Sequence, residues 1–381
     1  MLETRLDLGR IRAARRVIDP VFLDSPLYRC EALDPVLGCA LSIKLETANP
    51  VRSFKGRGTE VVADQLARTS SPAVVCASAG NLGQALAWSA RSRGIDVTVV
   101  ASRFATPTKL DRIRALGAKL ELVDGDHELA RDRAAEIAGA EGIRLLEDSL
   151  DLETCEGAAT IGLELAEAFQ TSAPGNHPPY ATTPSNTRPG ITPPPGNTTP
   201  GNTPRPGNNS APGNSSAGRT TAGEQRSARR EGPAVLIALG GGAMATGIGY
   251  VLKTLAPEVE IICVQPHGAP AMTRSWHERR VVTTDSINTI ADGVAGRRPI
   301  PEVLTDLLAV ADDAVLVEES SIIKAIRVLH DHAGLITEPS AALGVAAILE
   351  NPTRFANRHL TTIICGNNTD PTTYATWLGP R

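Results

Sequence analysis

Two small-residue loops carry residue types that are suited to binding chemistry. The apolar run at 73–77 leads into SAGN (78–81), and the apolar run at 234–239 leads into GGGAMATG (240–247). Successive glycines let backbone N–H groups converge on a small anion, and the start of a following helix adds its positive end. GGGAMATG therefore predicts a site for one phosphate group, and SAGN predicts a site for a carboxylate or a ring hydroxyl.

Simpler alternatives exist for both loops. GGGAMATG could be only a tight turn, and SAGN could cap a helix without any ligand. GGGAMATG is not a P-loop, because the GK[ST] ending is missing, and the next apolar run, EIICVQ (260–265), lacks the acidic end of a dinucleotide site.

One lysine completes the set. Lys55 lies between Phe54 and Gly56 in VRSFKGRG (51–58), where an extended segment meets a helical pattern. Most lysines are solvated, but a partly desolvated lysine can act as a nucleophile toward an aldehyde. A phosphorylated aldehyde cofactor would use this lysine and both loops together.

Apolar, β-branched runs alternate with helical patterns along most of the chain. This alternation predicts an α/β fold with a mainly parallel sheet covered by helices on both faces. In such folds ligands bind at the carboxyl ends of strands, where the two loops are expected. The expected strands are 73–78, 97–102, 119–124, 234–239, 260–265, 314–319 and 361–366. The expected helices are 82–94, 107–117, 127–142, 246–257, 320–334 and 339–351.

Composition narrows the class of protein. Apolar residues make up 41% of the 381 residues and aromatic residues only 3%, so the core must consist mainly of Ala, Val, Leu and Ile. A net charge of −4 with mixed signs gives no reason to expect nucleic acid or a membrane as partner. No apolar run approaches the ~20 residues of a membrane span, and the six cysteines lack metal-ligand spacing. We expect a cytoplasmic protein.

The segment 171–232 differs from the rest. It is rich in Pro, Gly, Asn, Thr and Ser, with loose repeats such as PGNTT and PGNNS. Such a composition has almost nothing to bury, so we predict a disordered insert that loops out of the fold. A docking role for this insert is the alternative.

The ordered motifs SFKGRG, SAGN, GGGAM and CGNN resemble the pyridoxal-phosphate enzymes of the tryptophan-synthase β-like group, fold type II. TIADGVAG (289–296) and TEPSAALGVAA (337–347) are more similar to the serine/threonine dehydratase family within that group. The resemblance implies pyridoxal 5'-phosphate as cofactor and two open, twisted, mainly parallel-sheet domains flanked by helices. It also implies a large cofactor-binding domain (1–50 and 151–381, with the insert) and a small substrate-binding domain (51–150).

The resemblance further implies roles for particular residues. Lys55 would bond to the cofactor and then act as the base at Cα, Phe54 would pack against the ring, and Asn81 would bond the ring hydroxyl. The phosphate would be held by Gly240, Gly241, Gly242, Ala243 and Met244. The substrate pocket would be lined by Ser78, Ala79, Leu82 and Gly293. Ala243 replaces the family's usual fourth glycine, so its φ must be negative.

Two positions favour elimination as the reaction. Cys365 matches the residue that faces the pyridine nitrogen, and a neutral thiol leaves the ring a moderated electron sink. Racemases of the group place an acid–base hydroxyl at the position of Ala79, which cannot supply one. Together with IADGVA, these residues predict deamination of L-threonine and/or L-serine to a 2-oxo acid and ammonia.

Two alternatives remain open. The first is β-replacement or threonine-synthase-like chemistry, in which a nucleophile captures the dehydrated intermediate. The second is a non-catalytic protein that binds amino acids. In relatives that bind a cation, an acidic residue stands where this chain has Gln265, so no metal site is expected. We expect an amino-acid substrate and a homodimer.

Overall fold

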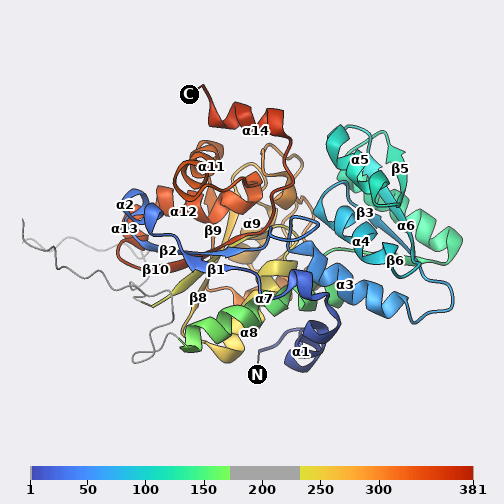
Figure 1. Ribbon diagram of the computed structural model, residues 1–381, viewed down its shortest axis with the longest axis horizontal. Coiled ribbons are helices and arrows are strands. Elements are labelled where there is room, and N and C mark those ends of the chain that lie inside the picture. The colour runs from blue at the N-terminus through green and yellow to red at the C-terminus, as the bar shows by residue number, and fades with distance from the viewer. Residues whose placement is uncertain (1, 172–231, 381) are drawn as a thin grey trace, which may run out of the picture.

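The computed structural model describes residues 2–171 and 232–380, and its larger sheet has six strands (Figure 1). Their order is β1-β2-β10-β7-β8-β9, with β1 antiparallel to β2 and all other neighbours parallel. The strands are β1 (Leu27–Arg29), β2 (Ala40–Leu45), β7 (Ala234–Ala238), β8 (Glu260–Pro266), β9 (Asp313–Val317) and β10 (His359–Ile364).

The smaller sheet has four strands in the order β5-β4-β3-β6, and all of its pairs are parallel. Parallel strands need crossover connections, and the helices between them supply these. The strands are β3 (Ala73–Ala77), β4 (Asp96–Ser102), β5 (Lys119–Val123) and β6 (Arg144–Leu146).

Helices cover both faces of the larger sheet, with α7 and α8 on one side and α11 and α12 on the other (Figure 1). In chain order the helices are α1 (Leu8–Val17), α2 (Asp34–Leu37), α3 (Lys55–Leu66), α4 (Asn81–Arg91), α5 (Pro107–Ala115), α6 (His127–Glu141), α7 (Leu152–Thr171), α8 (Ala243–Leu255), α9 (Ala271–Glu278), α10 (Pro301–Val310), α11 (Glu319–Ala333), α12 (Leu343–Glu350), α13 (Pro352–Phe355) and α14 (Pro371–Leu378).

The fold class predicted from the sequence is confirmed, and each expected strand and helix is present with small shifts at its ends. The pattern at 339–351 begins as a 3₁₀ turn, Pro339–Ala342, before α12. Strands β1, β2 and β6 were not expected. β1 and β6 have only three residues each, and β2 (ALSIKL) contains a buried Lys44 that interrupts the apolar pattern.

The core matches the aromatic-poor composition. Its largest cluster is built almost entirely from aliphatic side chains of the larger sheet and of the helices packed on it. Burying one such side chain stabilises the fold by about 1.5–3 kcal/mol. Helix α3 packs on α7 where Gly58 meets Gly157: a Cβ on Gly157 would lie 2.5 Å from the Cα of Gly58. This contact brings the chain that carries Lys55 tightly against α7.

Strands of the larger sheet lie within 1–50 and 151–381, and those of the smaller sheet lie within 51–150. The assignment of cofactor binding to the first unit and substrate binding to the second stays a prediction. The predicted disordered insert lies outside the described residues, apart from its ends Thr171 and Gly232. Over the described ranges, no helix is both long and apolar enough to cross a membrane.

Candidate active site

One cavity of about 570 Å³ lies where the carboxyl ends of strands from both sheets meet. Every candidate site residue from the sequence lines it, although those residues come from segments far apart in the chain. They are Phe54, Lys55, Ser78, Ala79, Asn81, Leu82, Gly240, Gly241, Gly242, Ala243, Met244, Gly293 and Cys365.

Lys55 is the first residue of α3, and its side chain is only 16% exposed. Its Nζ lies 4.7 Å from the centre of the Phe54 ring, and it forms an ion pair with the Oδ2 atom of Asp148. A cation over an aromatic face is attracted by the ring electrons. Lys55 is therefore held in the cavity between a ring and a carboxylate.

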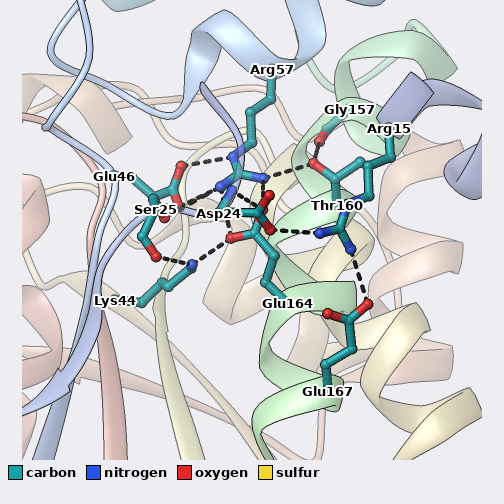
Figure 2. Close-up of polar contacts among 10 residues, drawn as sticks. All are labelled: Arg15, Asp24, Ser25, Lys44, Glu46, Arg57, Gly157, Thr160, Glu164 and Glu167. Carbon is teal, nitrogen blue, oxygen red and sulfur yellow. Dashed lines mark hydrogen bonds and ion pairs between the residues drawn. The ribbon is translucent and has the colours of Figure 1, made fainter. Parts of the chain in front are cut away.

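A buried charge network fixes the first turn of α3 (Figure 2). Arg57 is fully buried; its Nε donates to Glu46 at 2.8 Å and its Nη1 donates to Glu164 at 2.6 Å. Lys44 also pairs with Glu164, so the network joins β2, α3 and α7. Because Arg57 follows Lys55 by two residues, this network holds the backbone that carries the lysine.

Ionisation of Glu164 depends on these partners. Its burial opposes ionisation, but hydrogen bonds and charge contacts with Arg57 and Lys44 outweigh that effect and lower the pKa of the carboxyl below its ordinary value. The two carboxylates and two cations of the network thus carry balanced charge in the protein interior.

The glycine loop (240–242) leads into α8 and has no room for larger residues. Gly242 has φ +112°, and a Cβ there would lie 2.5 Å from Val303 Cγ1. A Cβ on Gly241 would lie 2.6 Å from Ser149 Oγ. Ala243 begins α8 and is not among the residues with positive φ, as its side chain requires.

The same loop offers free donors. Within residues 2–171 and 232–380, the backbone N–H groups of Gly241, Gly242 and Met244 donate no hydrogen bond to another residue. They surround the N-terminus of a 13-residue helix, whose dipole attracts negative charge. The loop therefore fits a phosphate group.

Asn81 is the first residue of α4, and both the nitrogen and the oxygen of its side-chain amide form hydrogen bonds. Its Nδ2 donates to Glu338 Oε2 at 2.9 Å, and its Oδ1 accepts from Asn368 Nδ2 at 2.8 Å. Glu338 also accepts from the backbone N–H of Asn368 at 2.7 Å. Burial, followed by the charge of Asp292, raises the pKa of Glu338 above its ordinary value.

Cys365 follows β10 and is 6% exposed. Burial raises the pKa of its thiol to about 12, and the charge of Glu338 adds to this effect. The thiol is therefore neutral at neutral pH. Its position opposite the pyridine nitrogen remains a prediction.

The remaining candidates form other parts of the wall. Ser78 and Ala79 lie between β3 and α4, where Ser78 Oγ accepts from the N–H of Gly80 at 3.2 Å. Leu82 packs mainly into the core of the smaller sheet. Gly293 lies against Ser340, because a Cβ there would be 2.8 Å from its Oγ. The TIADGVAG and TEPSAALGVAA segments thus meet at the cavity.

Among the polar wall residues that sequence reasoning missed are Asp148, Ser149 and Glu338. Asp148 and Ser149 follow β6, a strand too short to be recognised from its residues. An acidic run, EDSLD, directly after an apolar pair was the available signal. Glu338 lies within TEPSAALGVAA, a segment that indicates the family but does not by itself assign a role to this carboxylate.

Ion pairs link the two sides of the cavity at its rim. Lys109 of α5 pairs with Asp292, and Asp126, before α6, pairs with Arg297 at 2.6 Å. Exposed pairs of this kind each contribute about 0–1 kcal/mol. They hold the unit around the smaller sheet against the loop that contains Gly293.

Metal ligands are not grouped in the described part of the chain: no set of three or more His, Cys, Asp or Glu side chains is placed to hold an ion. Gln265 accepts a hydrogen bond from the N–H of Thr273 at 3.0 Å and so has a structural partner.

Comparison with known proteins identifies the family. The model of the pyridoxal-phosphate dependent enzymes matches residues 18–182 and 202–366, and the chain belongs to this family. An L-threonine ammonia-lyase of Thermotoga maritima is 26% identical over 366 residues, which cover 96% of this chain and 76% of that protein. A phenylserine dehydratase of Ralstonia pickettii is 26% identical over 377 residues, covering 98% and 96%. The solved structure of processed threonine deaminase isoform 2 from Solanum lycopersicum has a TM-score of 0.75 and 25% identity, covering 99% and 96%.

The resemblance seen in the sequence is confirmed, and pyridoxal phosphate is the cofactor of this chain. The glycine loop, with its free N–H groups and its lack of space for a Cβ, fits the phosphate of that cofactor. The chain is a pyridoxal-phosphate-dependent enzyme of the lyase type.

Proposed function

We propose that this enzyme deaminates L-threonine and/or L-serine, removing water across Cα and Cβ to give a 2-oxo acid and ammonia. The main observation in support of the proposal is that Lys55, the glycine loop and Asn81 all line one cavity. Sequence comparison also supports the proposal, because two relatives that match 96% and 98% of this chain are named as an ammonia-lyase and a dehydratase.

The cofactor, once bound, supplies an electron sink for the electron pair left when Cα loses its proton. Lys55 would hold the cofactor through Nζ, the glycine loop would bind its phosphate, and Asn81 would bond its ring hydroxyl. Once its bond to the cofactor is released, the neutral Lys55 amine would act as the base that takes the proton from Cα. Phe54 covers one side of Nζ and restricts the approach of water.

Two wall residues favour elimination. At its predicted place opposite the ring nitrogen, the neutral Cys365 thiol would bring no negative charge there, which would favour passing the electrons from Cα on to expel the β-hydroxyl. Ala79 has no proton to deliver to the opposite face of Cα. Loss of the β-hydroxyl as water leaves an unsaturated amine, which reacts with water to form the 2-oxo acid and ammonia.

The test compares Lys55→Ala with Lys324→Ala, a change at an exposed lysine of α11. Each protein is incubated with pyridoxal phosphate and then with L-serine, L-threonine, phenylserine or D-serine. Wild type and Lys324→Ala should show the visible absorbance of lysine-bound cofactor and release equal amounts of 2-oxo acid and ammonia. Lys55→Ala should lose both the absorbance and the products.

Two results would replace this proposal. Product that forms only when a thiol or amine co-substrate is added would indicate β-replacement. Tight binding of amino acids without any product would indicate a non-catalytic binding protein. The expected homodimer and the cytoplasmic location stay predictions, and light scattering of the purified protein measures the former.

A further inference from the structure

Asp148 stands in the cavity wall with half of its carboxylate unused. Its Oδ2 pairs with Lys55, whereas its Oδ1 is closed to solvent and has no hydrogen-bond partner among the described residues. A buried acceptor without a partner is unfavourable, and more so when the group is charged.

The turn that carries Asp148 is rigid. Ser149 has φ +70°, a left-handed conformation that is uncommon for a residue other than glycine. Ser149 N donates to Thr154 Oγ1 at 3.1 Å, and Ser149 Oγ accepts from the N–H of Ala243 at 3.1 Å. Strained residues that neighbours hold in place are concentrated at functional sites. This turn fixes Asp148 relative to the glycine loop.

Apart from Lys55, the groups near Asp148 described next do not compensate its charge. Burial lowers the pKa of His127, so that imidazole is neutral at neutral pH. The thiols of Cys76 and Cys155 have pKa values raised to about 12, chiefly by burial and then by the charge of Asp148. Arg131, also in the wall, pairs with Glu147 at 2.8 Å. Lys55 is the cation that pairs with Asp148 in the described structure.

We propose that Asp148 is the docking carboxylate for the ammonium group of the substrate. This inference rests on the proposed function, because it assigns a second residue to the same cavity. The substrate nitrogen must reach the place of Lys55 Nζ in order to replace it. Asp148 already contacts that place through Oδ2.

Asp148 would bind the substrate nitrogen before that nitrogen exchanges with Nζ. In the exchange, a bond from the substrate nitrogen to the cofactor carbon would form while the bond from Nζ breaks. The ammonium would give one proton to water before it attacks, and a second proton would pass from the substrate nitrogen to Nζ, which leaves Lys55 as the neutral amine that takes the proton from Cα. A full ammonium therefore faces Asp148 before the exchange, on the substrate. Hydrogen bonds between an ammonium and a carboxylate are about twice as strong as neutral ones.

The test measures binding without turnover. Alanine has an ammonium group but no β-hydroxyl, so its binding to the holoenzyme is followed by the change in visible absorbance of the bound cofactor. Propionate has the same carbon skeleton and carboxylate without the ammonium, and calorimetry measures its binding. The variant is Asp148→Asn, and the matched control is Asp313→Asn. Asp313 is similarly exposed (28%, against 31% for Asp148) and pairs with Arg354 outside the cavity.

Asp148→Asn should weaken alanine binding by about tenfold or more, the loss expected for a hydrogen bond to a charged group. Its affinity for propionate should stay within about twofold of wild type. Asp313→Asn should change neither. Wild-type affinity of Asp148→Asn for alanine overturns the proposal, and so does an equal loss for alanine and propionate.

A second variant tests whether alanine binding depends on the negative charge at position 148 or on the size of its side chain. Asp148→Glu keeps a carboxylate and should bind alanine more tightly than Asp148→Asn; the reverse order overturns the proposal even if Asp148→Asn folds poorly. The outcome is independent of dehydration. Alanine binding by an enzyme that makes no 2-oxo acid contradicts the proposed function alone, and a normal Asp148→Asn contradicts this inference alone.

Discussion

The guanidinium of Arg57 and the carboxylate of Glu164 form a buried ion pair. Two hydrogen bonds join them, at 2.6 and 3.1 Å, and Glu46 occupies the other side of the guanidinium (Figure 2). Glu164 belongs to α7, and Arg57 lies in the first turn of α3. The pair therefore connects the lysine-bearing turn to the helix beneath the larger sheet.

Replacing Arg57 by Met should destabilise the enzyme strongly. The change leaves buried Glu46 without its cation and Glu164 with Lys44 as its remaining buried cation, and breaking such a pair costs about 3–5 kcal/mol. Urea unfolding followed by circular dichroism measures the loss in free energy of unfolding. Arg68→Met is the control, because Arg68 pairs with Asp64 on the surface and should cost about 0–1 kcal/mol. Equal losses for the two variants would contradict a structural role for the network.

Gly157→Ala should also destabilise the enzyme, for a steric reason. A Cβ there would lie 2.5 Å from the Cα of Gly58 and 2.6 Å from the carbonyl oxygen of Arg57, so α3 must move away from α7. Overpacking of this kind costs about 1–3 kcal/mol.

The control for that steric effect is Gly139→Ala in α6. A Cβ on Gly139 has no neighbour within 4 Å, so alanine should stabilise the helix by about 0.5–1 kcal/mol. Differential scanning calorimetry should give a lower melting temperature for the first variant and a higher one for the second. A shift of the same sign in both would count against close packing of α3 on α7.

Gly242→Ala should weaken cofactor binding by about tenfold or more. A Cβ at φ +112° is strained and would lie 2.5 Å from Val303, so the N–H groups of the loop would turn away from the phosphate. Equilibrium dialysis against pyridoxal phosphate measures the affinity.

Gly94→Ala is the control that distinguishes backbone strain in general from a change in the cofactor site. Gly94 has φ +64° and no neighbour within 4 Å of a Cβ, and it does not line the cavity. Its replacement should lower stability by about 1 kcal/mol without changing cofactor affinity. If both variants lose affinity equally, general destabilisation rather than the loop explains the effect.

Glu338 predicts a pH dependence of stability. Its pKa is raised in the folded protein, chiefly by burial, so the folded state holds the proton more tightly than the unfolded state does. Stability contributed by the protonated carboxyl is present at acid pH and is lost as pH rises from the ordinary value of 4.5 through the raised value. The free energy of unfolding of wild type should therefore fall relative to Glu338→Gln across this window. Urea titrations at a series of pH values test this; a constant or rising difference would contradict it.

Local motifs were enough to find most of the candidate site. SFKGRG, SAGN and the glycine run each combine a strand end with a helix start, and such features are set by neighbouring residues. Asp148 was missed for two reasons. It pairs with Lys55, which lies 93 positions away in the sequence, and it follows a strand of only three residues, which is hard to recognise. Glu338 was missed for a similar reason: its contact with Asn81 joins α4 to a 3₁₀ turn across 257 positions.

The burial of Arg57 was also hidden in the sequence. An arginine beside a glycine in KGRG is typical of an exposed turn, and burial of its charge requires carboxylates from two other elements. Those partners, Glu46 and Glu164, are brought together only when β2 and α7 pack. Pattern analysis of one segment cannot detect a charge that is compensated by distant segments.

The place of β10 in the larger sheet has a consequence for how the chain folds during synthesis. Strands β3 to β6 all lie within 73–146, so the smaller sheet can form while the rest of the chain is still being made. Strand β10 lies between β2 and β7, and it pairs residues 359–364 with residues 40–45. Until the ribosome has released β10, one edge of β2 stays unpaired, which exposes the nascent chain to wrong strand partners. The enzyme should therefore depend most on chaperones late in its synthesis.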